Sequence, residues 1–302
     1  MMKVLLTGAQ GMLGRALMRS APAHVVVQAY DRKQLDIVQA DQVEQAVMRC
    51  KPDVIINAAA YTQVDRAEAE PEKAYAVNRD GALHLAQMAA RLGVPLLHFS
   101  TDYVFDGVFS DGVCRPYTEE DVPNPLNVYG ASKLAGERAV LAAHEQALII
   151  RTSSLFDSQG CGADFMGWVL AKAREEKMKE QKVLRVVDSW VSCPTPVESL
   201  AGVVWLLVDR VGMKKRGFPY GVYHYAGMPA VSRYDWACEI IKVAQQKGLV
   251  AHDVEVIRCS VEELPLAAKR PVYSALDCGR IQRVLGIGLI GKKGEWRSMF
   301  NL

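Results

Sequence analysis

The sequence has little that would favour a secreted, membrane-bound or disulfide-stabilised protein. Its longest apolar run, near residues 203–208, is far shorter than the roughly 18 residues that a membrane-spanning helix requires. The N-terminus enters a strand pattern directly and lacks the features of a signal peptide. The 7 cysteines are scattered without close pairs, which argues against a disulfide scaffold or a zinc site and for a reducing compartment. We therefore expect a cytoplasmic protein with no metal site and no membrane partner.

An excess of charge of one sign is also absent. The 36 lysines and arginines nearly balance the 34 acidic residues, and no basic block is interleaved with aromatic residues. We therefore expect no nucleic-acid partner. Hydrophobic residues make up 50% of the 302 residues and charged residues 23%, so the chain can bury a core. Its length suits one large domain, or a main domain with a smaller lobe.

A glycine turn follows the first apolar segment. Residues 2–7 resemble a strand buried on both faces, and Gly8, Gly11 and Gly14 follow before a helical pattern begins. In a dinucleotide-binding turn, Gly8 would make the tight turn, Gly11 would let a pyrophosphate approach the backbone, and Gly14 would allow close helix packing. Free N–H groups at the helix N-terminus would then face the phosphates. The spacing is three and three, whereas the commonest dinucleotide fingerprint has two and three.

The second predicted strand, at residues 25–30, ends in two residues that favour different cofactors. The carboxylate of Asp31 would hydrogen-bond a ribose 2′-hydroxyl, which favours NAD. The guanidinium of Arg32 would pair with a 2′-phosphate, which favours NADP. The sequence therefore predicts NADPH or NADH without a choice between them.

Strand and helix patterns alternate through the first half of the chain. We predict further strands at residues 54–57, 95–99 and 147–151, and helices that include residues 74–92. Beyond residue 152 the alternation loosens, and Phe165, Trp168 and Val169 share a helical face that we expect in a core. The pattern predicts an α/β fold, with a Rossmann-type doubly wound parallel sheet at residues 1–151. Residues 152–302 would form mainly a smaller C-terminal substrate-binding lobe, with some segments returning to the main sheet.

Polar residues with catalytic potential follow the central strand. Thr101 and Asp102 come directly after it, where a parallel sheet binds its ligand. Tyr129 and Lys133 lie four residues apart at the start of a predicted helix, so both would face the same side. A cation beside a phenol would lower the tyrosine pKa toward neutrality, and such a tyrosine can exchange a proton with a carbonyl oxygen. A surface tyrosine and lysine at helical spacing would look the same.

Four motifs in this order resemble the extended short-chain dehydrogenase/reductase family. They are the glycine turn, Asn57-Ala58-Ala59-Ala60, the run from Ser100 to Gly107 and the run around Tyr129 and Lys133. Within that group the chain is most similar to the dTDP-4-dehydrorhamnose reductase family, with residues 65–68 and 269–277 adding to the match. The resemblance covers essentially the whole length and is weaker in the second half.

The resemblance implies reduction of the C4 ketone of a deoxythymidine-diphosphate-linked 6-deoxyhexose, dTDP-4-dehydro-β-L-rhamnose, to dTDP-L-rhamnose. A reduced nicotinamide would deliver hydride, Tyr129 would protonate the oxygen, and Lys133 would hold the nicotinamide ribose. Thr101 would hydrogen-bond the reacting oxygen, and Arg270 would meet the substrate diphosphate. A surface ion pair is the alternative for Arg270. Further cofactor contacts are implied at Gly11, Met12, Leu13, Asp31, Asp36, Ile37, Ala60, Tyr61 and Thr62.

Two places depart from the family pattern. Ser154 stands where the family usually has an aromatic residue, often tryptophan, and residues 189–195 replace the usual Asp-Gln-x-Gly-x-Pro-Thr loop. Both places are expected to face the sugar or its nucleotide. We hypothesise that Trp190, within that loop, supplies some of the packing lost at Ser154. A homodimer is possible for this family.

Two other functions share the motifs. An epimerase or dehydratase would keep the fold, but Tyr103 follows Thr101-Asp102 where related dehydratases carry the glutamate needed to remove water. An epimerase would retain a tightly bound NAD, which a reductase releases. A non-catalytic NADP-binding subunit similar to the regulatory beta subunit of methionine adenosyltransferase is the third hypothesis.

Overall fold

The computed structural model describes residues 1–109, 112–159, 162–175, 183–212 and 217–288. Cys161 and the end of the predicted C-terminal lobe, residues 289–302, lie outside these ranges. The six cysteines within them are free thiols. None of the helices in these ranges combines the length and the apolar character that a membrane crossing needs.

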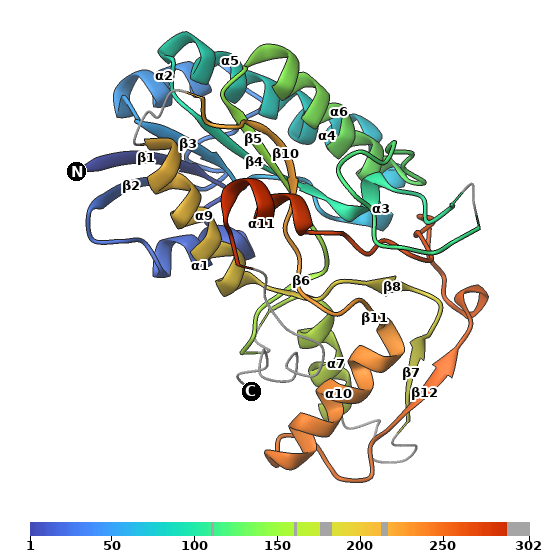
Figure 1. The fold of residues 1–302 in the computed structure, drawn as a ribbon. Coiled ribbons are helices and arrows are strands. Elements are labelled where there is room, and N and C mark those ends of the chain that lie inside the picture. Colours follow the sequence, from blue (N-terminus) through green and yellow to red (C-terminus); the bar gives the residue numbers. More distant parts are fainter. Residues whose placement is uncertain (110–111, 160–161, 176–182, 213–216, 289–302) are drawn as a thin grey trace.

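A parallel sheet forms the centre of the molecule and confirms the predicted α/β fold (Figure 1). Within the described residues it has six strands, in the spatial order β10 (Gly221–His224), β5 (Ala147–Thr152), β4 (Leu96–Thr101), β3 (Val54–Asn57), β1 (Met2–Thr7) and β2 (Val25–Tyr30). Their register places Thr7 beside Asn57, and Thr101 beside Thr152. The polar residues that end these strands therefore meet at one edge of the sheet.

Helices cover both faces of this sheet, because its strands are apolar on both sides. One face carries α1 (Met12–Arg19), α9 (Val197–Gly212) and α11 (Gly279–Leu285). The other carries α2 (Ala40–Cys50), α5 (Ala82–Leu92) and α6 (Val128–Ala143). Shorter segments precede or follow them: α3 (Val64–Ala69), α4 (Pro71–Tyr75), the π-helix η1 (Ala76–Gly81) and the 3₁₀ helices η2 (Asp102–Val104) and η3 (Val261–Glu263).

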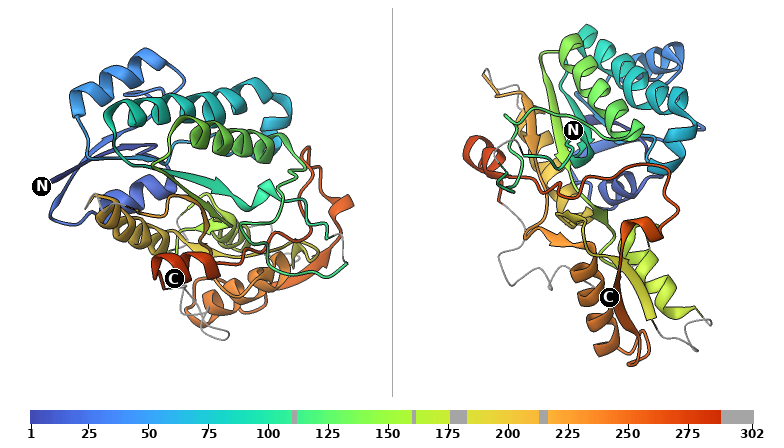
Figure 2. Two further views of the ribbon diagram at one scale, coloured as in Figure 1. Left: turned by 45° about the horizontal axis from the view of Figure 1, so that its top comes forward. Right: turned by 90° about the vertical axis from the view of Figure 1, so that its right-hand side faces the viewer.

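A smaller lobe stands below the sheet and its covering helices, as the right-hand view of Figure 2 shows. It has a separate apolar core between α7 (Phe165–Arg174), α10 (Arg233–Gln246) and a parallel pair of strands, β7 (Val183–Val187) and β12 (Glu255–Cys259). Two short pairs connect it to the sheet region: β6 (Leu155–Phe156) with β9 (Thr195–Pro196), and β8 (Val191–Ser192) with β11 (Val231–Ser232). From the second half of the chain, β10 pairs with β5 and α9 packs on α1.

Of two local predictions, one was confirmed and one was wrong. The helical stretch predicted at residues 74–92 is continuous, but its middle part is the π-helix η1. In η1 the buried Asn78 accepts a hydrogen bond from Tyr61 N and donates to the Tyr61 carbonyl oxygen and to Ser132 Oγ. These polar contacts come from segments far along the chain, so the local pattern could not show them. Trp168 was expected in a core, but the residue is 41% exposed and lines a cavity.

Candidate active site

A cavity of about 400 Å³ lies where β1, β3, β4 and β5 end at the same edge of the sheet. It brings together predicted residues from five separate segments of the chain. These are Gly11, Met12, Leu13, Ala60, Thr62, Thr101, Asp102, Tyr129, Lys133 and Ser154. The carboxyl edge of a doubly wound sheet is the usual ligand site of such folds, so this cavity is the candidate active site.

The glycine turn forms one wall of this cavity. Gly8 has a φ of +74°, and a Cβ there would lie 2.5 Å from the backbone of Ala58. A Cβ on Gly14 would lie 2.2 Å from the carbonyl oxygen of Gly8. Both positions therefore require glycine, which lets the loop after β3 and the first turn of α1 approach closely. Gly11 precedes α1 as its N-cap residue, so the free N–H groups of this helix start at the cavity.

Helix α6 positions the tyrosine and lysine. Its N-cap residue Asn127 accepts a hydrogen bond from Gly130 N at 2.8 Å, which fixes where the helix begins. A Cβ on Gly130 would lie 2.1 Å from the Tyr103 carbonyl oxygen, so the helix packs tightly against η2, which follows β4. Tyr129 and Lys133 follow on one side of α6, and both line the cavity.

The protein groups around Tyr129 do not lower its pKa, so that expectation was wrong. Burial raises the pKa of the Tyr129 phenol, hydrogen bonding to the Thr101 side chain opposes the rise, and the charges of Asp102 and Tyr103 add to it. Burial also lowers the pKa of Lys133 to about 8, against a smaller opposing effect of the Glu137 carboxylate. Lys133 Nζ donates to the Phe99 carbonyl oxygen at 2.6 Å. At neutral pH the phenol is therefore protonated and the lysine is mostly a cation.

Two serines that the sequence analysis missed hold the carboxylate of Asp102. Asp102 is 2% exposed, and its Oδ2 accepts hydrogen bonds from Ser153 Oγ at 2.7 Å and Ser274 Oγ at 2.6 Å. Its Oδ1 accepts from Thr101 Oγ1 at 3.1 Å, and Thr101 Oγ1 in turn accepts from the backbone N–H of Tyr103. Burial raises the pKa of Asp102, whereas the three hydroxyl hydrogen bonds lower it. Asp102 is thereby fixed beside Thr101 at the floor of the cavity.

A second cavity, of about 640 Å³, adjoins the first, because Asp164 lines both. Trp190 and Arg270 line this second cavity, with the Arg270 guanidinium 5.4 Å from the Trp190 ring centroid. Arg270 also forms a bidentate salt bridge with Asp65. Its Nη1 lies 3.0 Å from Oδ1 of Asp65, and its Nη2 lies 2.5 Å from Oδ2. Trp190 therefore faces a cavity, and its replacement of the packing lost at Ser154 stays a prediction.

The remaining predicted cofactor residues do not line the cavity. Asp31 Oδ1 accepts from the backbone N–H groups of Lys33 and Gln34, and the exposed Arg32 lies 3.8 Å from Asp36 in an ion pair. Ile37 is buried, and Tyr61 donates from its hydroxyl to Glu70 at 3.0 Å. Gly8 and Gly14 shape the turn behind Gly11.

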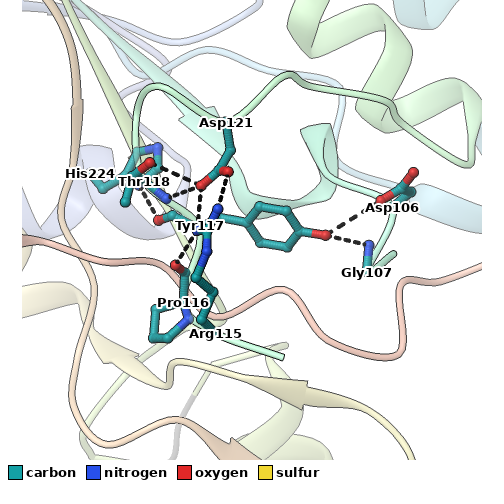
Figure 3. Close-up of polar contacts among 8 residues, drawn as sticks. All are labelled: Asp106, Gly107, Arg115, Pro116, Tyr117, Thr118, Asp121 and His224. Atoms are coloured by element: carbon teal, nitrogen blue, oxygen red, sulfur yellow. Dashed lines mark hydrogen bonds and ion pairs between the residues drawn. The ribbon is translucent and has the colours of Figure 1, made fainter. Parts of the chain in front are cut away.

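The segment between β4 and α6, predicted as a surface loop, is fixed by polar contacts (Figure 3). The Tyr117 hydroxyl accepts from Gly107 N at 2.9 Å and donates to Asp106 at 3.3 Å. Arg115 and Asp121 form a bidentate salt bridge, with Nη1–Oδ2 and Nη2–Oδ1 distances of 2.8 and 2.6 Å. The Tyr117 contacts join the two arms of the loop, and the Arg115–Asp121 pair holds the second arm.

The cavity suits a nicotinamide dinucleotide. Its glycine turn leaves room at a helix N-terminus, and it is lined by hydroxyls that have no partner of their own. Ser100 Oγ and Thr152 Oγ1 are both buried without a hydrogen-bond partner, and both residues line the cavity. Orphaned buried hydroxyls cost free energy unless a ligand satisfies them. Within the described residues, no group of three or more histidine, cysteine or acidic side chains could hold a metal ion.

Comparisons with known proteins agree with this site. The family model described as "RmlD substrate binding domain" matches residues 2–300. The dTDP-4-dehydrorhamnose reductase of Aggregatibacter actinomycetemcomitans is 38% identical over 305 residues, covering 100% of this chain and 98% of the relative. That of Mycolicibacterium smegmatis is 38% identical over 299 residues, covering 98% of this chain and 83% of the relative.

Solved structures give the same result. The structure of dTDP-4-dehydrorhamnose reductase from Bacillus anthracis in complex with NADP has a TM-score of 0.86 and 33% identity. It covers 99% of this chain and 98% of that one. UDP-glucose 4-epimerase of Thermus thermophilus, at 20% identity and a TM-score of 0.76, shares the fold alone.

The extent of these matches confirms the resemblance found in the motifs. The family model and the relatives span nearly the whole chain, including its less regular second half. The chain belongs to the dTDP-4-dehydrorhamnose reductase family, within the extended short-chain dehydrogenases/reductases.

Proposed function

We propose that this chain reduces the C4 ketone of dTDP-4-dehydro-β-L-rhamnose to dTDP-L-rhamnose with NADPH or NADH. Family membership supports the substrate, and the NADP in the Bacillus anthracis structure supports NADPH. The observation that carries the proposal is the convergence of Tyr129, Lys133 and Thr101 on one cavity beside the glycine turn. The predicted cytoplasmic location and homodimer stay predictions.

The dinucleotide would be held by the glycine turn, by Asp31 or Arg32 at the end of β2, and by Lys133 at its nicotinamide ribose. When bound, its reduced nicotinamide supplies the hydride. The chain's own residues supply the proton and the orientation of the ketone.

Tyr129 is the proton donor in this proposal. Because burial raises its pKa, the phenol keeps its proton at neutral pH and can transfer it to the alkoxide oxygen of the substrate. The Lys133 cation, one turn further along α6, favours the phenolate that remains after the transfer. Such positioned acids typically accelerate a reaction by about 10²–10⁴-fold.

Thr101 would stabilise the same oxygen. Its hydroxyl lies beside the Tyr129 phenol and donates its one proton to Asp102 Oδ1, and it would turn this O–H from Asp102 to the substrate oxygen as negative charge develops there. Asp102 is anchored by Ser153 and Ser274 and therefore keeps Thr101 oriented. The cavity that contains Arg270 and Trp190 would take the nucleotide end of the substrate.

The test is an oxidation assay of NADPH and NADH with dTDP-4-dehydro-rhamnose made in place by the upstream enzymes. We expect cofactor oxidation that depends on the ketosugar, and dTDP-rhamnose as the product. Cofactor binding without turnover, together with co-purification of a synthetase, would instead indicate a regulatory subunit. Purified protein that carries stoichiometric NAD would indicate an epimerase.

A further inference from the structure

A buried carboxylate lies one helical turn beyond Lys133. Lys133 and Glu137 are four residues apart on α6, and each is only 2% exposed. Side chains at this spacing share a face of the helix and are close enough to form an ion pair. In the described part of the chain they bind other groups instead. Glu137 pairs with Arg151 from β5, and Lys133 Nζ donates to the Phe99 carbonyl oxygen.

Arg151 occupies both oxygens of the Glu137 carboxylate. Its Nε donates to Oε1 at 2.9 Å, and its Nη2 donates to Oε2 at 2.7 Å. Arg151 is 4% exposed, so this bidentate salt bridge lies out of water, where an unpaired charge is costly. The carboxylate of Glu137 is therefore bound by Arg151 rather than by Lys133.

The other side of the Arg151 guanidinium is fixed by β10 and by an aromatic ring. Its Nη1 lies 3.4 Å from His224 Nε2. His224 Nδ1 donates to the Tyr117 carbonyl oxygen at 3.0 Å, so in the neutral ring Nε2 is the acceptor for Arg151. Burial and the charge of Arg151 lower the pKa of His224 to about 3, so the ring is neutral at physiological pH. The guanidinium carbon also lies over the Phe105 ring, 5.3 Å from its centroid. These contacts hold Arg151 in place against Glu137.

The other titratable groups described near Lys133 are neutral or bound elsewhere. Tyr129, one turn back on α6, keeps its proton because burial raises the pKa of its phenol. His98, from β4, is neutral because burial and the charge of Lys133 lower the pKa of its ring. Asp102 accepts three hydroxyl hydrogen bonds at the floor of the cavity. Acidic side chains of the neighbouring α3, α4 and η1 bind other groups: Asp65 binds Arg270, Glu68 binds Val128 N, Glu70 binds Arg66 and Lys73, and Asp80 binds Arg79. Burial lowers the pKa of the Lys133 amine, and Glu137 supplies the carboxylate charge that opposes this shift.

We propose that Arg151 is a positioning residue for the reduction: by holding both oxygens of Glu137, it prevents this carboxylate from pairing with the Lys133 ammonium. Lys133 is then left to hold the nicotinamide ribose and to favour the phenolate of Tyr129 after proton transfer. The inference rests on the proposed function, because these roles of Lys133 belong to it. Arg151 does not line the cavity and acts through Glu137.

The test compares Arg151→Met, Glu137→Gln and the double variant with the wild type, at about pH 6.5, where Lys133 is a cation. In Arg151→Met the Glu137 carboxylate loses its arginine and should pair with Lys133, so kcat at saturating NADPH should fall by about ten- to a hundredfold. Glu137→Gln breaks the same salt bridge but leaves no carboxylate beside Lys133. Its kcat per folded protein should therefore stay within a few-fold of the wild type. The double variant should regain the kcat lost in Arg151→Met for the same reason.

The pKa of Lys133 gives a readout that a purely structural role of Arg151 would not change. NMR of protein with isotope-labelled lysine measures it, and the signal is assigned by its loss in Lys133→Met. In Arg151→Met this pKa should rise from about 8 toward 10.5, by at least about one pH unit, because an adjacent carboxylate favours the ammonium. In Glu137→Gln and in the double variant it should not rise. Thermal unfolding of each variant, with and without NADPH, gives the folded fraction.

Equal losses of kcat in Arg151→Met and Glu137→Gln would overturn the inference, because the salt bridge would then only stabilise the fold. A pKa of Lys133 that does not rise in Arg151→Met would overturn it as well. If Arg151→Met does not fold, Arg151→Lys takes its place, since lysine keeps a cation beside Glu137 but lacks the planar fork that holds both oxygens. The pKa of Lys133 must then rise in that variant.

The proposed function is judged separately from this inference. A wild type that never oxidises NADPH with the ketosugar refutes the proposed reduction, while the pKa of Lys133 in the variants still tests the effect of Arg151 on Glu137. If the wild type reduces the ketosugar and the pKa of Lys133 is the same in Arg151→Met, only the inference fails.

Discussion

Lys133 should make the stability of this protein depend on alkaline pH. Its amine is buried beneath the cavity with one described hydrogen bond, to the Phe99 carbonyl oxygen. Burial lowers its pKa from 10.5 to about 8. The unfolded chain therefore binds more protons than the folded one between these two values, and stability rises with pH across that window.

The magnitude follows from the size of the shift. A lowering by about 2.5 pH units, at about 1.36 kcal/mol per unit, corresponds to about 3 kcal/mol. This stability is fully present above pH 10.5 and is lost as the pH falls through about 8. Lys133→Met removes the titrating group and keeps an unbranched side chain of similar length.

The assay is urea unfolding of the wild type and Lys133→Met at a series of pH values. The free energy of unfolding of the variant minus that of the wild type should be constant below about pH 8. It should then decrease by about 3 kcal/mol as the pH rises to 10.5. Titration of groups that do not interact with Lys133 cancels in this difference. A difference that stays constant over the whole pH range would refute the claim that burial lowers the pKa of the Lys133 amine.

Two further predictions concern packing around the site. Glu137→Gln should lower the free energy of unfolding by about 3–5 kcal/mol, because it leaves the guanidinium of Arg151 buried without its carboxylate. Urea unfolding measures this, and Glu44→Gln, at an exposed ion pair, should cost less than about 1 kcal/mol. Gly14→Ala should cost about 1–3 kcal/mol and weaken NADPH binding, because its Cβ would meet the Gly8 carbonyl. Gly202→Ala, on an open face of α9, should be neutral or stabilising by up to about 1 kcal/mol, and a comparable loss in both glycine variants would contradict the packing argument.

The sheet could be predicted because its signals are local. The strands at residues 2–7, 25–30 and 54–57 have the bounds expected from their apolar runs. The glycine turn was recognisable because a positive φ at Gly8 and the close approach at Gly14 restrict those positions to one residue type. A pattern within about ten residues carries this kind of information.

The polar contacts that complete the cavity could not be predicted, because they join distant segments. Ser153 and Ser274 reach Asp102 across 51 and 172 residues of sequence. Arg233 reaches Ser154 across 79 residues. The pKa of Tyr129 was predicted in the wrong direction for a related reason. The spacing to Lys133 is visible in the sequence, but the burial that dominates the pKa is not.

The role of Tyr129 is the central claim, and its test is the turnover of Tyr129→Phe with dTDP-4-dehydro-rhamnose. The account predicts a kcat lower by about 10²–10⁴-fold, with NADPH binding nearly unchanged, because only the proton donor is removed. Tyr220→Phe, which removes a hydroxyl outside the cavity, should keep wild-type turnover. Wild-type turnover in Tyr129→Phe would contradict the account.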